Sequence, residues 1–133
     1  MPVADTELLL ALNPRDKKHR KALEGKRILT KGLKIPDTAI LEFQIVLRAR
    51  GRSPKEVALA LTALKQILKT RRIKVVQTLN INTLIKQSEL EEKYNLSYFD
   101  SLIAASALTL DKIIISDDKA FDKIPDLKRI PIS

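Results

Sequence analysis

Residues 96–118 of the chain read LSYFDSLIAASALTLDKIIISDD. The middle of this stretch, Ala104–Ala107, has only small side chains, which predicts a helix packed closely against a sheet or another helix. It is followed by Ile113–Ile115, a run of β-branched apolar residues that is typical of a buried strand. A helix that leads into a buried strand is the repeating unit of α/β folds with parallel sheets.

The same alternation extends over the rest of the chain. Ser53-Pro54-Lys55-Glu56 has the cap, proline and glutamate that begin a helix, and Asp37 or Thr38 is the expected cap of the preceding helix. The sequence therefore predicts one α/β domain over residues 1–133 with a mainly parallel sheet. Short apolar runs predict strands at 2–5, 28–29, 33–35, 75–76, 113–115 and 128–130, and helical patterns lie at 6–12, 15–25, 38–51, 53–70, 82–94, 96–107 and 118–122.

Four acidic residues stand where apolar segments meet helical ones: Asp5, Glu42, Asp100 and Asp118. Burying an unpaired carboxylate is costly, and several together repel one another unless a proton or a cation intervenes. Asp5 and Asp118 both end predicted strands, and ligands of open parallel sheets bind beyond the carboxyl ends of the strands. We therefore expect the four acids to meet at one edge of the sheet and to hold Mg²⁺ or Mn²⁺, which prefer oxygen ligands.

The overall charge of the chain favours a polyanionic partner. It has 25 lysines and arginines against 16 acidic residues, which gives a net charge of +9. Such a charge attracts nucleic acid, whereas an aromatic content of 4% leaves little room for base stacking. The chain has no cysteine, and its one histidine, His19, lies in a strongly basic run, so thiolate and imidazole chemistry are not expected.

Four segments together resemble the PIN domain family. They are Val3-Ala4-Asp5-Thr6, Ile40-Leu41-Glu42-Phe43, Ser97–Ala105 and Ile114–Asp122, so that the similarity covers essentially the whole chain. The resemblance implies a three-layer α/β sandwich with a parallel sheet of about five strands between helices. It also implies an Mg²⁺- or Mn²⁺-dependent ribonuclease, and many family members are VapC-type toxins with an antitoxin partner.

The resemblance assigns the acidic quartet to Asp5, Glu42, Asp100 and Asp118, with Thr6 and Ser116 as polar neighbours. Two positions depart from the family pattern. Glu7 replaces the usual asparagine or serine, and Asp117 stands next to Asp118, so that either could supply the fourth carboxylate; the spacing to Ser116 favours Asp118.

Each of these residues also has an ordinary structural interpretation. Asp5, Asp100 and the Asp117-Asp118 pair are all acceptable helix caps or turn residues, and Glu42 could lie on a solvated helix face. The basic segments are typical of solvated helix surfaces, although Arg48, Arg50 and Arg52 follow the helix that carries Glu42 and could line a path for a nucleic-acid backbone. The apolar stripes of residues 56–68 could form core or the seam of a homodimer.

Three functions remain open from the sequence. The first is a metal-dependent endoribonuclease with RNA as substrate, and the second is a non-catalytic nucleic-acid-binding or complex-forming module of the same fold. The third is a receiver or an aspartyl-phosphate phosphatase, but the former needs paired acids at the first strand and the latter an Asp where Glu7 stands. The chain begins without the pattern of a signal peptide and has no apolar run of membrane-spanning length, so we expect a cytoplasmic protein without membrane contact.

Overall fold

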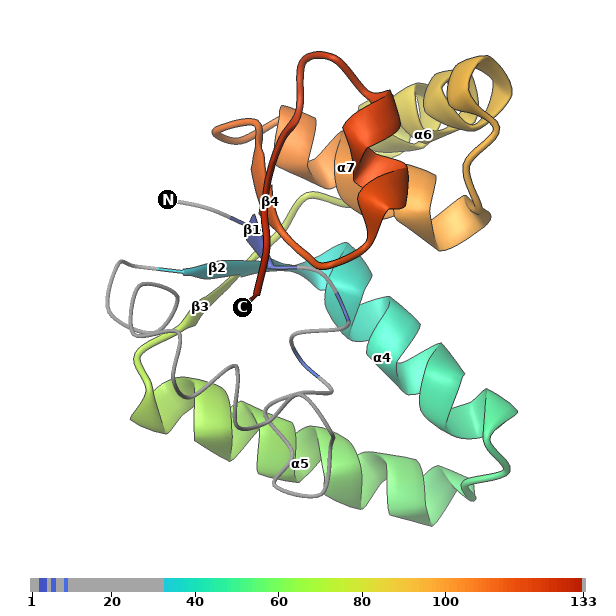
Figure 1. Ribbon diagram of the computed structural model, residues 1–133. Coiled ribbons are helices and arrows are strands. Elements are labelled where there is room, and N and C mark those ends of the chain that lie inside the picture. Colours follow the sequence, from blue (N-terminus) through green and yellow to red (C-terminus); the bar gives the residue numbers. More distant parts are fainter. Residues whose placement is uncertain (1–2, 5, 7–8, 10–32, 133) are drawn as a thin grey trace.

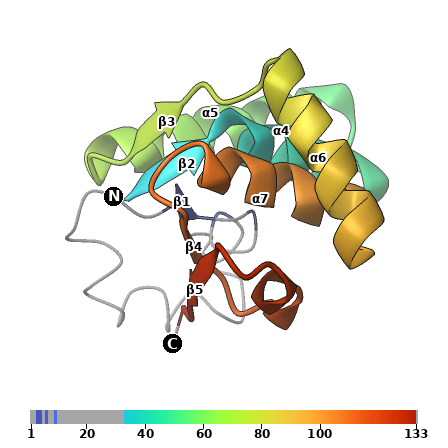
Figure 2. The same cartoon turned by 90° about the horizontal axis from the view of Figure 1, so that it is seen from above.

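The computed structural model describes residues 3–4, 6, 9 and 33–132. Five strands form a sheet in the order β3-β2-β1-β4-β5, and every neighbouring pair runs parallel (Figures 1 and 2). The mainly parallel sheet of about five strands that the sequence and the resemblance predict is therefore confirmed. The strands are β1 (Val3–Ala4), β2 (Lys34–Pro36), β3 (Lys74–Val76), β4 (Ile113–Ile115) and β5 (Lys128–Ile130).

The helices enclose the sheet from both sides. In Figure 1, α6 and α7 lie side by side above the sheet, and α5 lies below it. Helix α4 begins directly after β2 and runs away from the sheet before the chain turns back along α5 to β3. These helices are α4 (Asp37–Ala49), α5 (Pro54–Thr70), α6 (Ile81–Tyr94) and α7 (Tyr98–Leu108), and a 3₁₀ helix, η1 (Lys119–Lys123), follows β4.

Local capping residues set where three of the four α-helices within residues 33–132 begin. Ser53 and Glu56 form a reciprocal capping box at the start of α5, because each side chain accepts a hydrogen bond from the backbone N–H of the other, at 3.2 and 3.0 Å. Asn80 caps α6 and Ser97 caps α7 in the same manner with one bond each. The capping box predicted from Ser53-Pro54-Lys55-Glu56 is confirmed.

The cap predicted for α4 is wrong. Pro36 occupies the N-cap position and supplies no side-chain hydrogen bond, while Asp37 is already the first helical residue. The carboxylate of Asp37 instead accepts hydrogen bonds from the backbone N–H groups of Thr78 and Leu79, 41 and 42 residues later in the chain. The local sequence pattern predicts that the Asp37 side chain caps α4, but in the folded protein this side chain binds the loop after β3 instead.

The core lies on both faces of the central strands. Val3, Ala4, Ile35 and Ile114 are completely inaccessible to solvent. Every residue of α7 from Ser101 to Ala107 is buried, as the small side chains predicted, because they allow this helix to approach the sheet closely.

Most of the remaining predictions hold within a residue or two, which is the usual uncertainty of element ends. The turn expected at 118–122 is η1, and the apolar stripe of 56–68 contributes Val57, Leu64 and Leu68 to the protein interior. Thr6 and Leu9 are helical, in agreement with the turn predicted there, whereas the helix predicted at 15–25 and the strand at 28–29 lie outside the described residues. None of the helices in the described part of the chain is long and apolar enough to cross a membrane.

Candidate functional site

The edge of the sheet where the strands end brings together several of the acids chosen from the sequence. Glu42 lies in the second turn of α4, which starts where β2 ends, and Asp100 lies in the first turn of α7. Asp118 follows β4 by three residues. Asp5 follows β1, the strand between β2 and β4, but its own placement lies outside the described residues.

Glu42 occupies a half-buried position beside Thr6. Burial raises the pKa of the Glu42 carboxyl, hydrogen bonding to the Thr6 side chain opposes this, and the negative charge of Asp100 raises the pKa further. Thr6 Oγ1 also lies 3.3 Å from the carbonyl oxygen of Ala39, so that Thr6 contacts α4 at two successive turns. Thr6 therefore helps to fix the position from which Glu42 faces Asp100.

Asp100 is held in place by the cap of its own helix. Ser97 Oγ accepts the backbone N–H of Asp100 at 3.2 Å, which makes Ser97 the cap and leaves the Asp100 carboxylate free of that role. Burial raises the pKa of Asp100, and the charge of Asp118 raises it further; hydrogen bonding to Ser97 and the charge of Lys123 act in the opposite direction. Asp100 thus interacts electrostatically with both Glu42 and Asp118.

The two neighbouring aspartates after β4 have different surroundings. Asp117 Oδ1 accepts the backbone N–H of Ile132 at 2.8 Å and so connects the end of β4 to the segment after β5. Asp118 Oδ1 accepts the N–H of Ala120 at 2.9 Å as the cap of η1, and its own N–H donates to Ser116 Oγ at 2.9 Å. The capping interpretation of Asp118 is therefore correct, and its charge also acts on Asp100.

Two basic residues near these acids were missed in the sequence. Lys123 at the end of η1 lowers the pKa of Asp100 by its charge. Arg129 on β5 donates to both carboxylate oxygens of Asp122, at 2.9 and 3.1 Å, and to the carbonyl oxygen of Ser116 at 3.1 Å. The sequence pattern predicts only a strand for the segment that contains Arg129, and no local pattern in the sequence relates either residue to the acids.

The donor chemistry of the site fits a hard divalent cation. Glu42, Asp100 and Asp118 offer carboxylate oxygens, and burial together with a neighbouring carboxylate raises the pKa values of Glu42 and Asp100, as expected where negative charges gather in a partly desolvated place. Within the described residues, no group of three acidic or histidine side chains is close enough to hold an ion by itself. Asp5 lies outside the described residues.

The remaining sequence candidates lie at the surface. Arg48, Arg50 and Arg52 are exposed around the end of α4, and Arg52 forms an ion pair with Glu56 at 3.5 Å. Tyr98 is 50% exposed at the start of α7 and packs edge-to-face against Phe99, with ring centroids 5.2 Å apart. The three arginines and Tyr98 are therefore accessible to a large ligand.

The chain is similar to a known protein family and to several solved structures. A family model described as PIN domain matches residues 3–127. No sequence among the curated proteins matches the chain.

Solved structures of the same fold include several toxin-antitoxin proteins. VapBC2 from Rickettsia felis, bound to a DNA fragment from its promoter, superposes with a TM-score of 0.70 at 18% identity, over 97% of this chain and 96% of that one. VapC20 from Mycobacterium tuberculosis, a toxin that cleaves the sarcin-ricin loop, gives 0.70 at 16% identity, over 92% and 93%. VapBC-1 from nontypeable Haemophilus influenzae gives 0.69 at 18% identity, over 98% and 96%. At these low sequence identities, the structural similarity shows only that the chains share a fold.

Proposed function

The chain belongs to the PIN domain family, and we propose that it is a metal-dependent endoribonuclease that cleaves RNA phosphodiester bonds. The observation that carries the proposal is the position of Asp100 at the edge where the strands end, close enough to Glu42 of α4 and to Asp118 after β4 to interact electrostatically with both. Asp5, which follows the central strand β1, completes the proposed set of catalytic and metal-binding carboxylates. Among the three functions that the sequence leaves open, the metal-dependent ribonuclease is the one in which all of these carboxylates act together, as ligands of a metal ion.

In this proposal the chain's own residues hold and orient the reacting groups. Asp5, Glu42, Asp100 and Asp118 would bind Mg²⁺ or Mn²⁺, which when bound activates water and neutralises charge on the phosphate. Thr6 keeps Glu42 in position, and Ser116 with Asp117 holds the loop that presents Asp118. Lys123, whose charge reaches Asp100, stands where it would also attract a substrate phosphate.

Exposed arginines would provide the path for the RNA backbone. Arg48 lies six residues beyond Glu42 on α4, about 9 Å further along the helix axis. Arg50 and Arg52 continue this positive surface into the turn before α5. Replacing all three with glutamine should raise KM for RNA and reduce its salt dependence, with kcat little changed.

The decisive experiment compares acids inside and outside the cluster. Asp100→Asn and Glu42→Gln should each abolish cleavage of a fluorescent RNA in Mg²⁺ or Mn²⁺, whereas Asp126→Asn, at an exposed position, should leave it intact. EDTA should stop the wild-type reaction, and a DNA oligonucleotide of the same sequence tests the preference for RNA. Full cleavage by a folded Asp100→Asn protein would reject the proposal in favour of a non-catalytic module.

We also propose a cytoplasmic toxin-antitoxin role, supported by the likeness to VapBC complexes. Expression of the chain alone should arrest growth, and co-expression of the reading frame directly upstream should restore it. Growth arrest that persists in the Asp100→Asn variant would contradict the link between toxicity and cleavage.

We propose a homodimer whose interface is formed by the outer face of α6. Ile81, Leu84 and Ile85 are 74%, 39% and 52% exposed on the side of the helix opposite the buried Thr83 and Leu90. Exposed apolar side chains that cluster on one face are typical of interfaces. Sedimentation velocity should show a dimer that Ile85→Glu converts to a monomer.

A further inference from the structure

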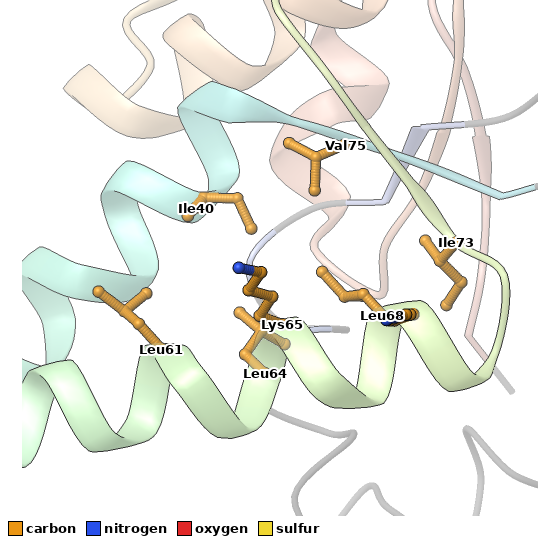
Figure 3. Close-up of a pocket in the computed structure, with 8 residues that line it drawn as sticks. Ile40, Leu61, Leu64, Lys65, Leu68, Ile73 and Val75 are labelled. Atoms are coloured by element: carbon orange, nitrogen blue, oxygen red, sulfur yellow. The ribbon is translucent and has the colours of Figure 1, made fainter.

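The two outer strands of the sheet have different chemical surroundings. Beside β3 lies a cavity of about 410 Å³, lined among the described residues by six aliphatic side chains and two lysines and by no carboxylate. Figure 3 shows these aliphatic side chains facing one another across the cavity. At the opposite end of the strand order, Arg129 of β5 lies close to carboxylates of η1 and of the segment after β4. The β5 end of the sheet is therefore the one that can act on the acidic cluster of Glu42, Asp100 and Asp118.

All three guanidinium nitrogens of Arg129 are hydrogen-bonded. Nε and Nη2 donate to the two carboxylate oxygens of Asp122, at 2.9 and 3.1 Å, and Nη1 donates to the carbonyl oxygen of Ser116 at 3.1 Å. A bidentate pair with a carboxylate fixes the plane of the guanidinium as well as its position. Only 17% of the Arg129 side chain is exposed. These contacts connect β5 to η1 and to the residue that directly follows β4.

Ser116 transmits this arrangement to the acidic cluster. Its side chain is buried, and its backbone is held by β5 on both sides, because its N–H donates to the carbonyl oxygen of Ile130 at 3.0 Å and its own carbonyl accepts from Arg129. Ser116 Oγ in turn accepts the backbone N–H of Asp118 at 2.9 Å. The position of Asp118 therefore depends on Arg129 through one intervening residue.

The charge of Arg129 by itself does not favour a cation nearby. Hydrogen bonding to Asp122 raises the pKa of Arg129, burial opposes this, and the charges of Asp117 and Asp118 raise it further, so the guanidinium lies within electrostatic reach of the cluster. A positive charge at that place repels a metal ion. Any favourable effect of Arg129 on cation binding therefore comes from geometry, and its sign is opposite to that of the charge effect.

We propose that Arg129 is a positioning residue: through Ser116 it holds Asp118 in the orientation that binds the metal ion. Asp122 keeps the guanidinium directed toward Ser116 and away from the carboxylates of the cluster. This inference rests on the proposed function, because it takes Asp118 as a metal ligand. It assigns no contact with RNA to Arg129, since the hydrogen bonds of the guanidinium are already directed to Asp122 and Ser116.

The direction of a change in Mn²⁺ affinity tests the proposal. Mn²⁺ is titrated into the full-length protein by calorimetry. Arg129→Gln removes a positive charge, which alone would strengthen binding, whereas the lost orientation of Asp118 should weaken it by about tenfold or more. Lys128→Gln is the matched control, because it removes the same charge from the preceding residue of β5, whose exposed side chain points to the other face of the sheet. The control should bind Mn²⁺ as tightly as the wild type or slightly more tightly.

Two further variants separate geometry from charge and from folding. Arg129→Lys keeps the charge but cannot form the bidentate pair, so it should bind Mn²⁺ as weakly as Arg129→Gln. Asp122→Asn changes a side chain that is 52% exposed, and an ion pair exposed to this degree contributes little to stability. This variant should therefore fold like the wild type and still bind Mn²⁺ more weakly, so that it carries the same test if Arg129→Gln does not fold.

RNA cleavage distinguishes a positioning residue from one that binds substrate. The loss of cleavage in Arg129→Gln should be restored by raising the Mn²⁺ concentration, and KM for RNA at saturating Mn²⁺ should equal that of the wild type. A raised KM that persists at saturating Mn²⁺ would assign Arg129 to RNA binding instead. Unchanged or tighter Mn²⁺ binding by the folded variant would leave Arg129 with a purely structural role and overturn the proposal.

A measurement without metal separates this inference from the proposed function. The backbone N–H groups of Asp118 and Ala120 donate to Ser116 Oγ and to Asp118 Oδ1, so their hydrogen exchange reports on the position of Asp118. In the metal-free protein their exchange, followed by NMR, should be faster in Arg129→Gln than in Lys128→Gln. Equal exchange in the two variants would reject the positioning of Asp118 by Arg129. A wild type that binds no Mn²⁺ would instead reject the proposed metal-dependent function.

Discussion

Thr78 donates two hydrogen bonds to one carboxylate oxygen of Asp37, from its backbone N–H at 2.9 Å and from its hydroxyl at 2.8 Å. The Thr78 hydroxyl also lies 2.9 Å from Ser106 Oγ, which in turn lies 2.8 Å from Thr38 Oγ1. This cluster joins the first turn of α4 to the loop after β3 and to α7. It therefore fixes the relative position of the two helices that carry Glu42 and Asp100.

Thr78→Val should lower the free energy of unfolding by about 1–3 kcal/mol, because it leaves the buried hydroxyl of Ser106 and the partly buried carboxylate of Asp37 with fewer partners while the side-chain volume hardly changes. Thr78→Ser, which keeps the hydroxyl, should recover most of the loss. Urea unfolding followed by circular dichroism measures both. Thr62→Val is the matched control, because its exposed hydroxyl bonds only to Ala58 of the same helix; an equal loss there would contradict the role of the cluster.

Ser53→Ala should destabilise the protein by about 1 kcal/mol, since the first turn of α5 loses its capping bond. Glu56→Ala removes the other half of the box and should have a smaller effect, because the Ser53 side chain can still cap the backbone N–H of residue 56 and alanine favours the helix. If the two bonds act together, the double variant loses less stability than the sum of the single variants. Thermal unfolding of the four proteins gives this coupling free energy directly.

The capping box of α5 and the hydrogen bonds between Thr78 and Asp37 together show how far the sequence can predict the structure. The Ser53–Glu56 box depends on residues three apart, so its geometry follows from local rules, and the small residues of α7 likewise indicate close packing. The bond from Thr78 to Asp37 spans 41 residues, and only the folded sheet brings the two together. The local rules therefore assigned Asp37 to a cap that it does not form.

The same limit applies to the candidate site. Parallel strands end at a common edge, so the sequence could predict which carboxylates to expect there. Lys123 and Arg129 could not be found in that way, because their relation to the acids depends on the path of η1 and on the pairing of β5 with β4. The outer neighbours of the acids are thus determined by tertiary structure.

Removing a clustered carboxyl should stabilise the metal-free protein. The pKa values of Glu42 and Asp100 are raised in the folded state, so the folded protein binds protons more tightly than the unfolded chain. Their contribution is most favourable below about pH 4, where both states are protonated, and is lost as the pH rises through the folded pKa values. Asp100→Asn should therefore gain roughly 0.3–1 kcal/mol at pH 7, a value reduced by the partial exposure of the group.

The measurement is chemical unfolding at pH 7 and pH 4 in EDTA. The gain from Asp100→Asn should shrink at pH 4, because the raised pKa of Asp100 makes the wild-type carboxyl increasingly protonated as the pH falls. Asp126→Asn should show no such gain, because the Asp126 carboxylate is exposed to solvent. A loss of stability in Asp100→Asn at pH 7 would contradict the electrostatic interpretation.

We expect Asp117 to have a structural role and Asp118 to have a functional one. Asp117→Ala removes the acceptor of the Ile132 N–H and should lower stability by about 1–3 kcal/mol, whereas Asp117→Asn keeps an oxygen at that position and should be milder. Asp118→Asn also keeps the oxygen that caps η1, so the fold should be preserved. Because it removes one of the carboxylates proposed to bind the metal, it should reduce RNA cleavage by about 100-fold or more. Cleavage rates and unfolding midpoints of the three variants test this division of roles, and a larger loss of cleavage in folded Asp117→Asn than in Asp118→Asn would reverse it.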